Sequence, residues 1–272
     1  MPVCDDGPDD HTDPRFPLYE GARVEMRKVS FSYPDSKTEA LSDIDFYADK
    51  GETVAIIGGT GSGKSTLIKI LLAMYPYGRG NIAINGTDYT ELTKGEIRLA
   101  YSVSLQKAMI FEGSLRDNIT MGREDASDEE IYSVISDVEL ADFVASKDEG
   151  LDYLIVGLGQ NVSGGQKQRI NMARTVIREA PIYVFDDSFS ALDYLTERKI
   201  QQKLFERLKG KTKILVTQRV STALAADRIY VMDRGRISAV GTHKELLRAS
   251  DIYRQICVSQ LGGRVGGDGV EE

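Results

Sequence analysis

The chain has 272 residues, of which 41% are hydrophobic and 28% charged, a balance typical of a globular protein. Its 34 basic and 42 acidic side chains give a formal net charge of −8, which argues against a nucleic-acid binder held by a general basic surface. No apolar run approaches the ~20 residues that span a bilayer, and the best candidate, residues 67–75, contains Lys69. Any membrane role is therefore expected to depend on a partner or to be peripheral.

Cysteine and histidine are scarce. The two cysteines, Cys4 and Cys257, lie near opposite ends, which is neither a disulfide framework nor a zinc spacing and fits a reducing compartment. One of the two histidines, His243, lies between Thr242 and Glu245 in a capping box that predicts a helix start. A histidine-based triad or metal cluster is not expected.

The first part of the chain indicates strands followed by one helix. Residues 1–19 are acidic and proline-rich and predict a flexible lead. Strands are then expected at residues 24–26, 44–47 and 53–57, and a helix at 64–75. A further short strand, closed by a turn, is expected at 81–84. The run 53–57 is continuously apolar, as in a buried strand.

The middle, residues 107–178, is predicted to be mainly helical. Ser127 opens a capping box, and Ile131, Val134, Ile135 and Val138 then share one helix face. Buried strands at 182–185 and 214–217, a hairpin over 229–240 and a closing helix over 243–260 are expected to follow, with a flexible tail at 262–272. Strands alternating with helices predict an α/β core carrying an inserted helical block.

A phosphate-binding loop follows the buried strand at 53–57. The segment matches G-x-x-x-x-G-K-[ST] and opens a helix, the context that supports the motif. Glycines let backbone N–H groups turn toward phosphate oxygens, and the helix start adds its positive dipole end. Lys64 would place a charge on the outer phosphates, and Ser65 a hydroxyl on Mg²⁺. The nucleotide-binding candidates in this segment are Gly58, Gly59, Thr60, Gly61, Ser62, Gly63, Lys64, Ser65 and Thr66.

Two carboxylates supply the remaining chemistry. Asp186 and Asp187 directly follow the apolar run at 182–185, where a neighbouring strand would end beside the loop. Asp186 is the candidate on the metal side, acting through water. Asp187 stands where an acid could orient or deprotonate an attacking water.

The segment Val162-Ser163-Gly164-Gly165-Gln166-Lys167-Gln168-Arg169 resembles the signature of ATP-binding cassette (ABC) proteins, with Val162 where Leu is usual. The resemblance extends over residues 20–260, and further motifs arrive in the family's order. They are Tyr33, which matches the aromatic that stacks on adenine, Gln106, which matches the glutamine that reaches Mg²⁺, and the interface loop Ser190, Ala191, Leu192 and Asp193. Residues 111–119 and 241–247 match phrases of the exporter branch.

This resemblance implies a P-loop NTPase core with an N-terminal antiparallel β subdomain and an inserted α-helical subdomain, within an ABC ATPase domain over residues 20–261. Two such domains would pack head to tail around ATP and Mg²⁺. Each ATP would lie between one P-loop and the Ser163, Gly164, Gly165 and Gln166 of the other chain. The resemblance assigns catalytic roles to Lys64, Gln106, Asp187 and Gln218, and metal contacts to Ser65, Gln106 and Asp186. It also implies a transmembrane exporter partner, a position on the cytoplasmic face of the membrane, and no nucleic acid.

Three positions depart from the family pattern. Asp187 replaces the usual Glu, which withdraws the carboxylate by about 1–1.5 Å. Gln218 replaces the usual His that contacts the γ-phosphate, and Gly157-Leu158 replaces Glu-Arg in a segment that touches the transmembrane part. The first two changes resemble the degenerate half of heterodimeric exporters, whose intact signature serves a non-identical partner's site. We therefore hypothesise slow hydrolysis at this chain's own site.

Other interpretations stay open at this point. Asp187 and Gln218 could be working variants in a homodimeric exporter ATPase, or mark an ATP-gated structural module with negligible hydrolysis. A soluble ABC ATPase acting on DNA or ribosomes usually has a coiled-coil insertion or tandem cassettes, and the sequence contains neither. A simple P-loop kinase would leave the signature without a role.

Overall fold

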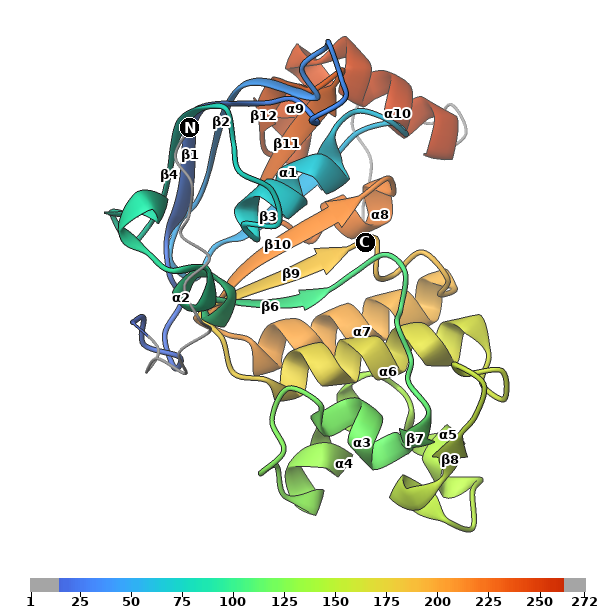
Figure 1. The fold of residues 1–272 in the computed structure, drawn as a ribbon. Helices are drawn as coiled ribbons and strands as arrows, with labels where there is room; N and C mark the ends of the chain where they lie inside the picture. The colour runs from blue at the N-terminus through green and yellow to red at the C-terminus, as the bar shows by residue number, and fades with distance from the viewer. Residues whose placement is uncertain (1–14, 262–272) are drawn as a thin grey trace.

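The computed structural model describes residues 15–261, and its centre is a six-stranded sheet in the order β12-β11-β3-β10-β9-β6 (Figure 1). All neighbouring strands are parallel except β12, which pairs antiparallel with β11. The strands are β3 (Thr53–Ile57), β6 (Tyr101–Ser104), β9 (Ile182–Asp186), β10 (Thr212–Thr217), β11 (Arg228–Asp233) and β12 (Arg236–Gly241). The predicted α/β core is confirmed.

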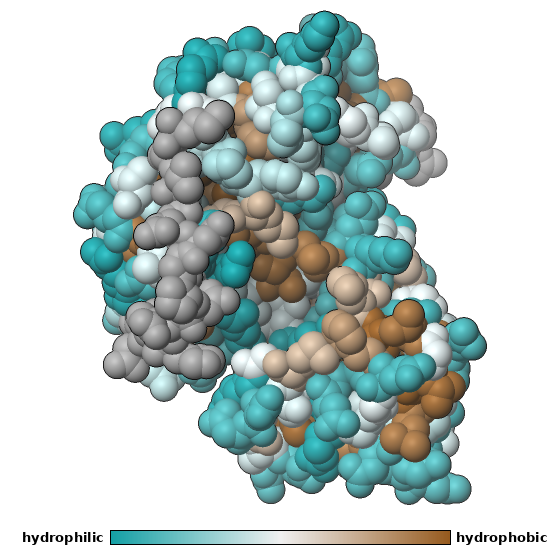
Figure 2. All heavy atoms as spheres, in the orientation of Figure 1, coloured by the Kyte–Doolittle hydropathy of each residue, from teal (hydrophilic) through white to brown (hydrophobic). Residues whose placement is uncertain are grey.

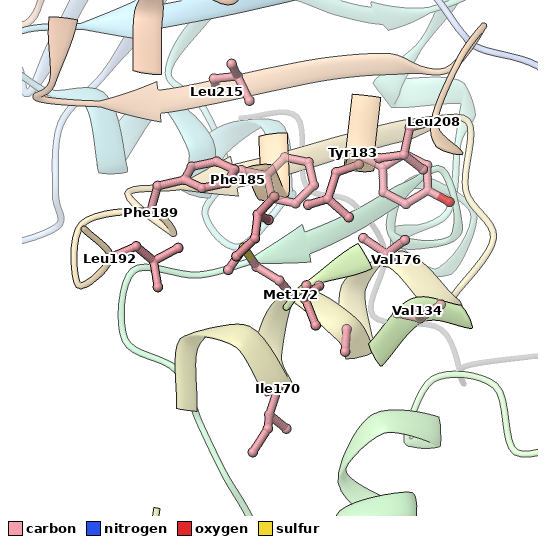
Figure 3. Close-up of a cluster of buried hydrophobic side chains, with 14 of the residues drawn as sticks. Val134, Ile170, Met172, Val176, Tyr183, Phe185, Phe189, Leu192, Leu208 and Leu215 are labelled. Carbon is pink, nitrogen blue, oxygen red and sulfur yellow. The ribbon is translucent and has the colours of Figure 1, made fainter. Parts of the chain in front are cut away.

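The central strands are apolar throughout because both faces of this sheet are covered. Every residue of β3, β9 and β10 is buried. Successive residues of β9 serve opposite faces: Tyr183 and Phe185 pack toward helices α6 (Gly164–Ile177) and α7 (Tyr194–Arg207), as Figure 3 shows. Ile182 and Val184 pack on the side of α1 (Lys64–Leu71). Helices therefore cover both faces, as a parallel sheet requires.

A second, antiparallel sheet precedes the core and confirms the predicted N-terminal β subdomain. Its order is β2-β1-β4-β5. The strands are β1 (Val24–Phe31), β2 (Leu41–Ala48), β4 (Arg79–Ile84) and β5 (Thr87–Asp88). Strand β2 alternates buried and exposed residues, so its buried face packs on α1 and the core sheet. Phe16 is buried in the same cluster, so packing begins four residues before residue 20.

The predicted helical subdomain is inserted between β6 and β9 and lies below the core sheet in Figure 1. The apolar face that begins at Ile131 packs on α6, which joins the subdomain to the core sheet. The subdomain comprises β7 (Gly113–Ser114), α3 (Leu115–Thr120), α4 (Asp128–Asp137), α5 (Ala141–Ala145), β8 (Leu154–Ile155) and α6. The capping box at Ser127 is present as predicted, with the Oγ accepting from the Glu130 N–H.

The closing helix differs from expectation. Two helices, α9 (His243–Ala249) and α10 (Asp251–Leu261), replace the single helix predicted over 243–260. Ser250 adopts extended backbone angles between them, and its Oγ accepts from the Tyr253 N–H. Serine favours helix caps over helix interiors for this reason. The capping box at Thr242 and Glu245 is confirmed.

Strand β6 and two short helices, α2 (Lys94–Leu99) and α8 (Val220–Ala223), were not predicted from the sequence. Most of the lead and the whole tail that were predicted to be flexible, residues 1–14 and 262–272, lie outside the described residues. Across residues 15–261, no helix combines the length and the apolar character needed to cross a bilayer.

Candidate nucleotide-binding site

The P-loop connects the end of β3 to the start of α1 and forms an open cradle. Gly61 and Gly63 have φ values of 78° and 105°, in the left-handed region that favours glycine. A Cβ at Gly58 would lie 2.4 Å from the Met232 carbonyl oxygen, whereas Cβ atoms at Gly59 and Gly61 would meet nothing within 4 Å. The loop is thus tight underneath and open above. This shape fits a phosphate chain at the N-terminus of α1.

Lys64, the first residue of α1, folds back into this cradle. Its Nζ donates to the carbonyl oxygens of Gly58 at 2.7 Å and Gly59 at 2.9 Å. Burial lowers the pKa of the ammonium group, and the carboxylates of Asp187 and Asp186 oppose that shift. The Lys64 Nζ also donates to Ser62 Oγ at 3.4 Å, so all three of these partners are neutral oxygens, which the cation can exchange for anionic ones.

A pocket of about 520 Å³ opens above the loop and brings most of the predicted residues together. They arrive from the P-loop and from the ends of three parallel strands: Gln106 after β6, Asp186 and Asp187 at β9, and Gln218 after β10. Ligands in open α/β sheets bind at these carboxyl ends. The lining residues are Glu39, Ala40, Thr60, Gly61, Ser62, Gly63, Lys64, Ser65, Thr66, Gln106, Asp186, Asp187, Gln218, Arg234 and Gly235.

The two acidic residues differ in their surroundings. Asp186 is 6% exposed, and burial, helped by the charge of Asp187, raises its pKa to about 6 against the opposing effects of Lys64 and Lys69. Asp187 is half-buried and has a φ of 48°, which aspartate tolerates better than most residues. Its N–H donates to the Val216 carbonyl at 2.7 Å. Gln106 Nε2 donates to Asp187 Oδ2 at 3.4 Å.

Tyr33 lies beside the pocket and does not line it. Its hydroxyl is 3.1 Å from the Thr66 Oγ1, and its ring packs edge-on against Phe31 and Tyr75. The aromatic predicted to stack on adenine is therefore held next to the P-loop helix. Four pocket residues were not predicted from the sequence: Glu39, which accepts a hydrogen bond from Arg79 at 2.8 Å, its neighbour Ala40, and Arg234 and Gly235 in the hairpin between β11 and β12.

The signature segment is not part of this pocket. Ser163 caps α6, its Oγ accepts from the Gln166 N–H at 3.2 Å, and Ser163 and Gly164 are exposed. A Cβ at Gly164 would meet nothing within 4 Å. The chain therefore has a second helix that starts beside glycines, and the start of this helix is exposed and does not line the pocket.

The interface loop connects the signature helix to the pocket. Gln168 of α6 is largely buried; its Oε1 accepts from the Ala191 N–H at 3.1 Å, and its Nε2 donates to Ser190 Oγ at 3.3 Å. From the pocket side, Arg219 donates to the Ser190 and Leu192 carbonyls at 2.6 and 3.1 Å. The sequence predicts no role for Gln168 or Arg219, because a polar residue next to a motif gives no signal of its partner.

The oxygen atoms that the side chains around the P-loop provide fit a nucleotide bound with Mg²⁺. Ser65, Gln106 and Asp186 offer the hydroxyl, amide and carboxylate oxygens that Mg²⁺ accepts together with phosphate oxygens and water. Within residues 15–261 there is no group of three or more His, Cys, Asp and Glu side chains that could hold a metal by themselves. The site therefore suits a cation that enters with the phosphates.

The sequence model of the family described as ABC transporter matches residues 41–190. The chain belongs to this family. The ABC chain is 39% identical over 248 residues to the probable multidrug resistance ABC transporter ATP-binding/permease protein YheI of Bacillus subtilis, covering 90% of this chain and 42% of that one. It is 36% identical over 232 residues to the ATP-dependent lipid A-core flippase of Hahella chejuensis, covering 85% and 40%.

A solved structure agrees with these relatives. A bacterial Atm1-family ABC exporter with ATP bound matches the ABC chain with a TM-score of 0.86 and 33% identity, covering 93% of this chain and 44% of that one. The chain thus spans about two-fifths of the length of the relatives it matches. The predicted family and its exporter branch are confirmed.

Proposed function

We propose that this ABC domain binds ATP with Mg²⁺ and hydrolyses it to power a transmembrane exporter through nucleotide-driven dimerisation. The main support for the proposal is that the start of α1, at the P-loop, and the start of α6, at the signature segment, lie in different places in the chain. Lys64 and Asp186 face one pocket, whereas Ser163 and Gly164 are exposed outside it. A second copy packed head to tail would place each signature opposite a P-loop, so that ATP holds the dimer and hydrolysis releases it.

Each pocket residue would have a distinct task. Lys64 and the P-loop N–H groups would hold the phosphates, and Ser65, Gln106 and Asp186 would hold the metal ion, which neutralises phosphate charge when bound. Tyr33 would stack on the adenine. Asp187 would orient the water that attacks the γ-phosphate, and Gln218 would donate a hydrogen bond to that phosphate.

The chain's own site is proposed to turn over slowly. Asp187 has a shorter side chain than Glu, and a general base must lie about 2.6–3.2 Å from its proton donor to contribute about 10²–10⁴-fold. Gln218 can donate a hydrogen bond but carries no charge. Both residues keep nucleotide binding while weakening hydrolysis. With an intact signature at Ser163, the chain suits a heterodimer in which it completes the active site of a non-identical partner.

The transmembrane partner would dock on the helical subdomain. Figure 2 shows apolar side chains gathered over this subdomain, toward the end that carries β7 and β8 in Figure 1. The exposed apolar residues in β8 and in the segments next to β7 and β8 are Met109, Phe111, Leu154, Val156 and Leu158. Leu158 is 68% exposed and stands at one of the departures from the family pattern. Such a surface would place the domain at the cytoplasmic face of the membrane.

Phosphate release tests the proposal when bound ATP is quantified in the same sample. The native chain is compared with its Asp187→Glu/Gln218→His double variant under saturating Mg-ATP. We expect equal ATP binding and a turnover at least about 10-fold higher in the double variant, the low end of what base placement can supply. Equal turnover would favour a homodimeric pump with working Asp and Gln. Bound ATP with no turnover in either protein would favour an ATP-gated structural module.

A further inference from the structure

The side chain of Gln260, on the last turn of α10, makes two hydrogen bonds to the backbone of residues 218–220. Its Nε2 donates to the Gln218 carbonyl oxygen at 2.6 Å. Its Oε1 accepts from the Val220 N–H at 2.9 Å. An amide side chain has one donor end and one acceptor end, so this pairing uses both. The two bonds span Arg219.

In the segment that Gln260 contacts, the Arg219 N–H donates to Thr217 Oγ1 at 2.9 Å and the Arg219 side chain donates to the interface loop, but neither bond satisfies the Val220 N–H. Helix α8 begins at Val220, and its N-cap, Arg219, makes no capping hydrogen bond with its side chain. The first N–H groups of a helix need partners from elsewhere, and Gln260 supplies one from a different helix. On the pocket side, the Gln218 Oε1 accepts one long hydrogen bond, from Thr60 Oγ1 of the P-loop at 3.4 Å.

Helix α10 is firmly anchored, which makes it a suitable support. Tyr253 and Cys257 are fully buried, and Gln260 follows them at the i, i+4, i+7 spacing that places all three on one helix face. The Tyr253 hydroxyl also lies 2.9 Å from His243 Nδ1 of α9. The core therefore fixes the helix face that presents the Gln260 amide.

We infer that Gln260 is a positioning residue that aims Gln218 at the γ-phosphate of the bound nucleotide. This inference rests on the proposed role of Gln218 as a γ-phosphate contact. If so, helix α10 contributes to the preference of the domain for ATP over ADP. Removal of the amide should leave the P-loop intact and loosen the loop that Gln218 occupies.

The test is the ratio of the affinities for the Mg²⁺ complexes of ADP and of a non-hydrolysable ATP analogue. In Gln260→Met the side chain keeps its length and loses both bonds. We expect its preference for the triphosphate to fall about three- to tenfold, the size expected when a hydrogen bond to a charged group is weakened. Its affinity for ADP should stay unchanged. Gln255→Met is the matched control, because Gln255 is exposed on the same helix and has no side-chain hydrogen bond to any residue between 15 and 261.

Two further variants separate the possible outcomes. Gln260→Glu keeps the acceptor for the Val220 N–H and lacks the donor for the Gln218 carbonyl, so its preference for the triphosphate should fall as it does in Gln260→Met. Gln218→Ala should lose that preference. If Gln218→Ala loses it and Gln260→Met keeps it, the positioning role is overturned and the proposed function stands. If Gln218→Ala keeps it, the proposed γ-phosphate contact itself is wrong.

Discussion

The P-loop and the signature segment use the same local chemistry in two different settings. Each places glycines at the start of a helix whose N–H groups point outward. Lys64 is buried at the floor of a pocket of about 520 Å³, near the buried Asp186. Ser163 is exposed on the inserted subdomain, and its cap is made entirely within its own turn. Under the proposed function, the first helix start forms a binding site within one chain, whereas the second would form one only with a second chain opposite it.

The comparison also explains why the two regions are linked inside one chain. Gln168 ties the signature helix to the interface loop, and Arg219 ties the same loop to the Gln218 segment of the pocket. A short series of hydrogen bonds thus connects the two helix starts through the interface loop. Such an arrangement suits a cycle in which two chains close and open around nucleotide.

The largest effect should come from Ser163→Arg. The long charged side chain would block the face that meets a partner's phosphates, so hydrolysis by the assembled transporter should fall about 10²-fold or more, as when one transition-state donor is lost. Nucleotide affinity of the isolated domain should not change, because Ser163 lies outside the pocket. Lys64→Met should give the reverse pattern, with affinity lost in the isolated domain. ATPase activity and equilibrium binding are measured on both variants. If hydrolysis survived Ser163→Arg, the proposed role of the signature segment at a partner's site would be wrong.

A smaller effect is expected at the proposed docking surface. Leu158→Glu places a charge where a 68% exposed leucine would be covered by the transmembrane part, which should weaken association about 10-fold or more. Val240→Glu is the control, since Val240 is 46% exposed on β12, in the core sheet. Association of the isolated domain with the membrane-embedded partner is measured by co-sedimentation. Equal losses in both variants would place docking elsewhere.

Tyr33 separates stacking from loop anchoring. Tyr33→Ala removes the ring and should weaken nucleotide binding about 10-fold, within the range for aromatic–base stacking. Tyr33→Phe removes only the hydroxyl that meets Thr66 and should retain most of the affinity. Titration with ATP and with inorganic tripolyphosphate distinguishes the two roles, because only ATP has a base to stack. A loss shared by both ligands would mean that Tyr33 supports the P-loop.

Contiguous motifs were predictable from the sequence, and contacts between distant polar residues were not. The P-loop and Asp186 are marked by the apolar strands that precede them, so their meeting follows from the sheet. Strand β6 was missed because Ser102 and Ser104 are buried in it, with hydrogen bonds to the Thr175 carbonyl and to Ser188 and Asn171. These bonds make serine compatible with a buried strand, which a hydrophobic pattern cannot reveal.

The smallest effect concerns acid stability at the junction of α9 and α10. Partial burial lowers the pKa of His243 below 6.5, so between the two pKa values the unfolded chain binds a proton that the folded chain does not. The free energy of unfolding therefore rises with pH through this window and falls as the solution is acidified below about pH 6.5. Between pH 7.5 and 5.5, His243→Gln should lose less free energy of unfolding in urea than the native protein does. His11→Gln, which removes the only other histidine, should lose as much as the native protein.

His243 contacts Tyr253 of the helix that presents Gln260, so any effect of pH on the triphosphate preference should be smaller in His243→Gln. Such a reduction would show that α9 and α10 act on the pocket. The effect of Ser163→Arg on hydrolysis should be the same with and without His243→Gln.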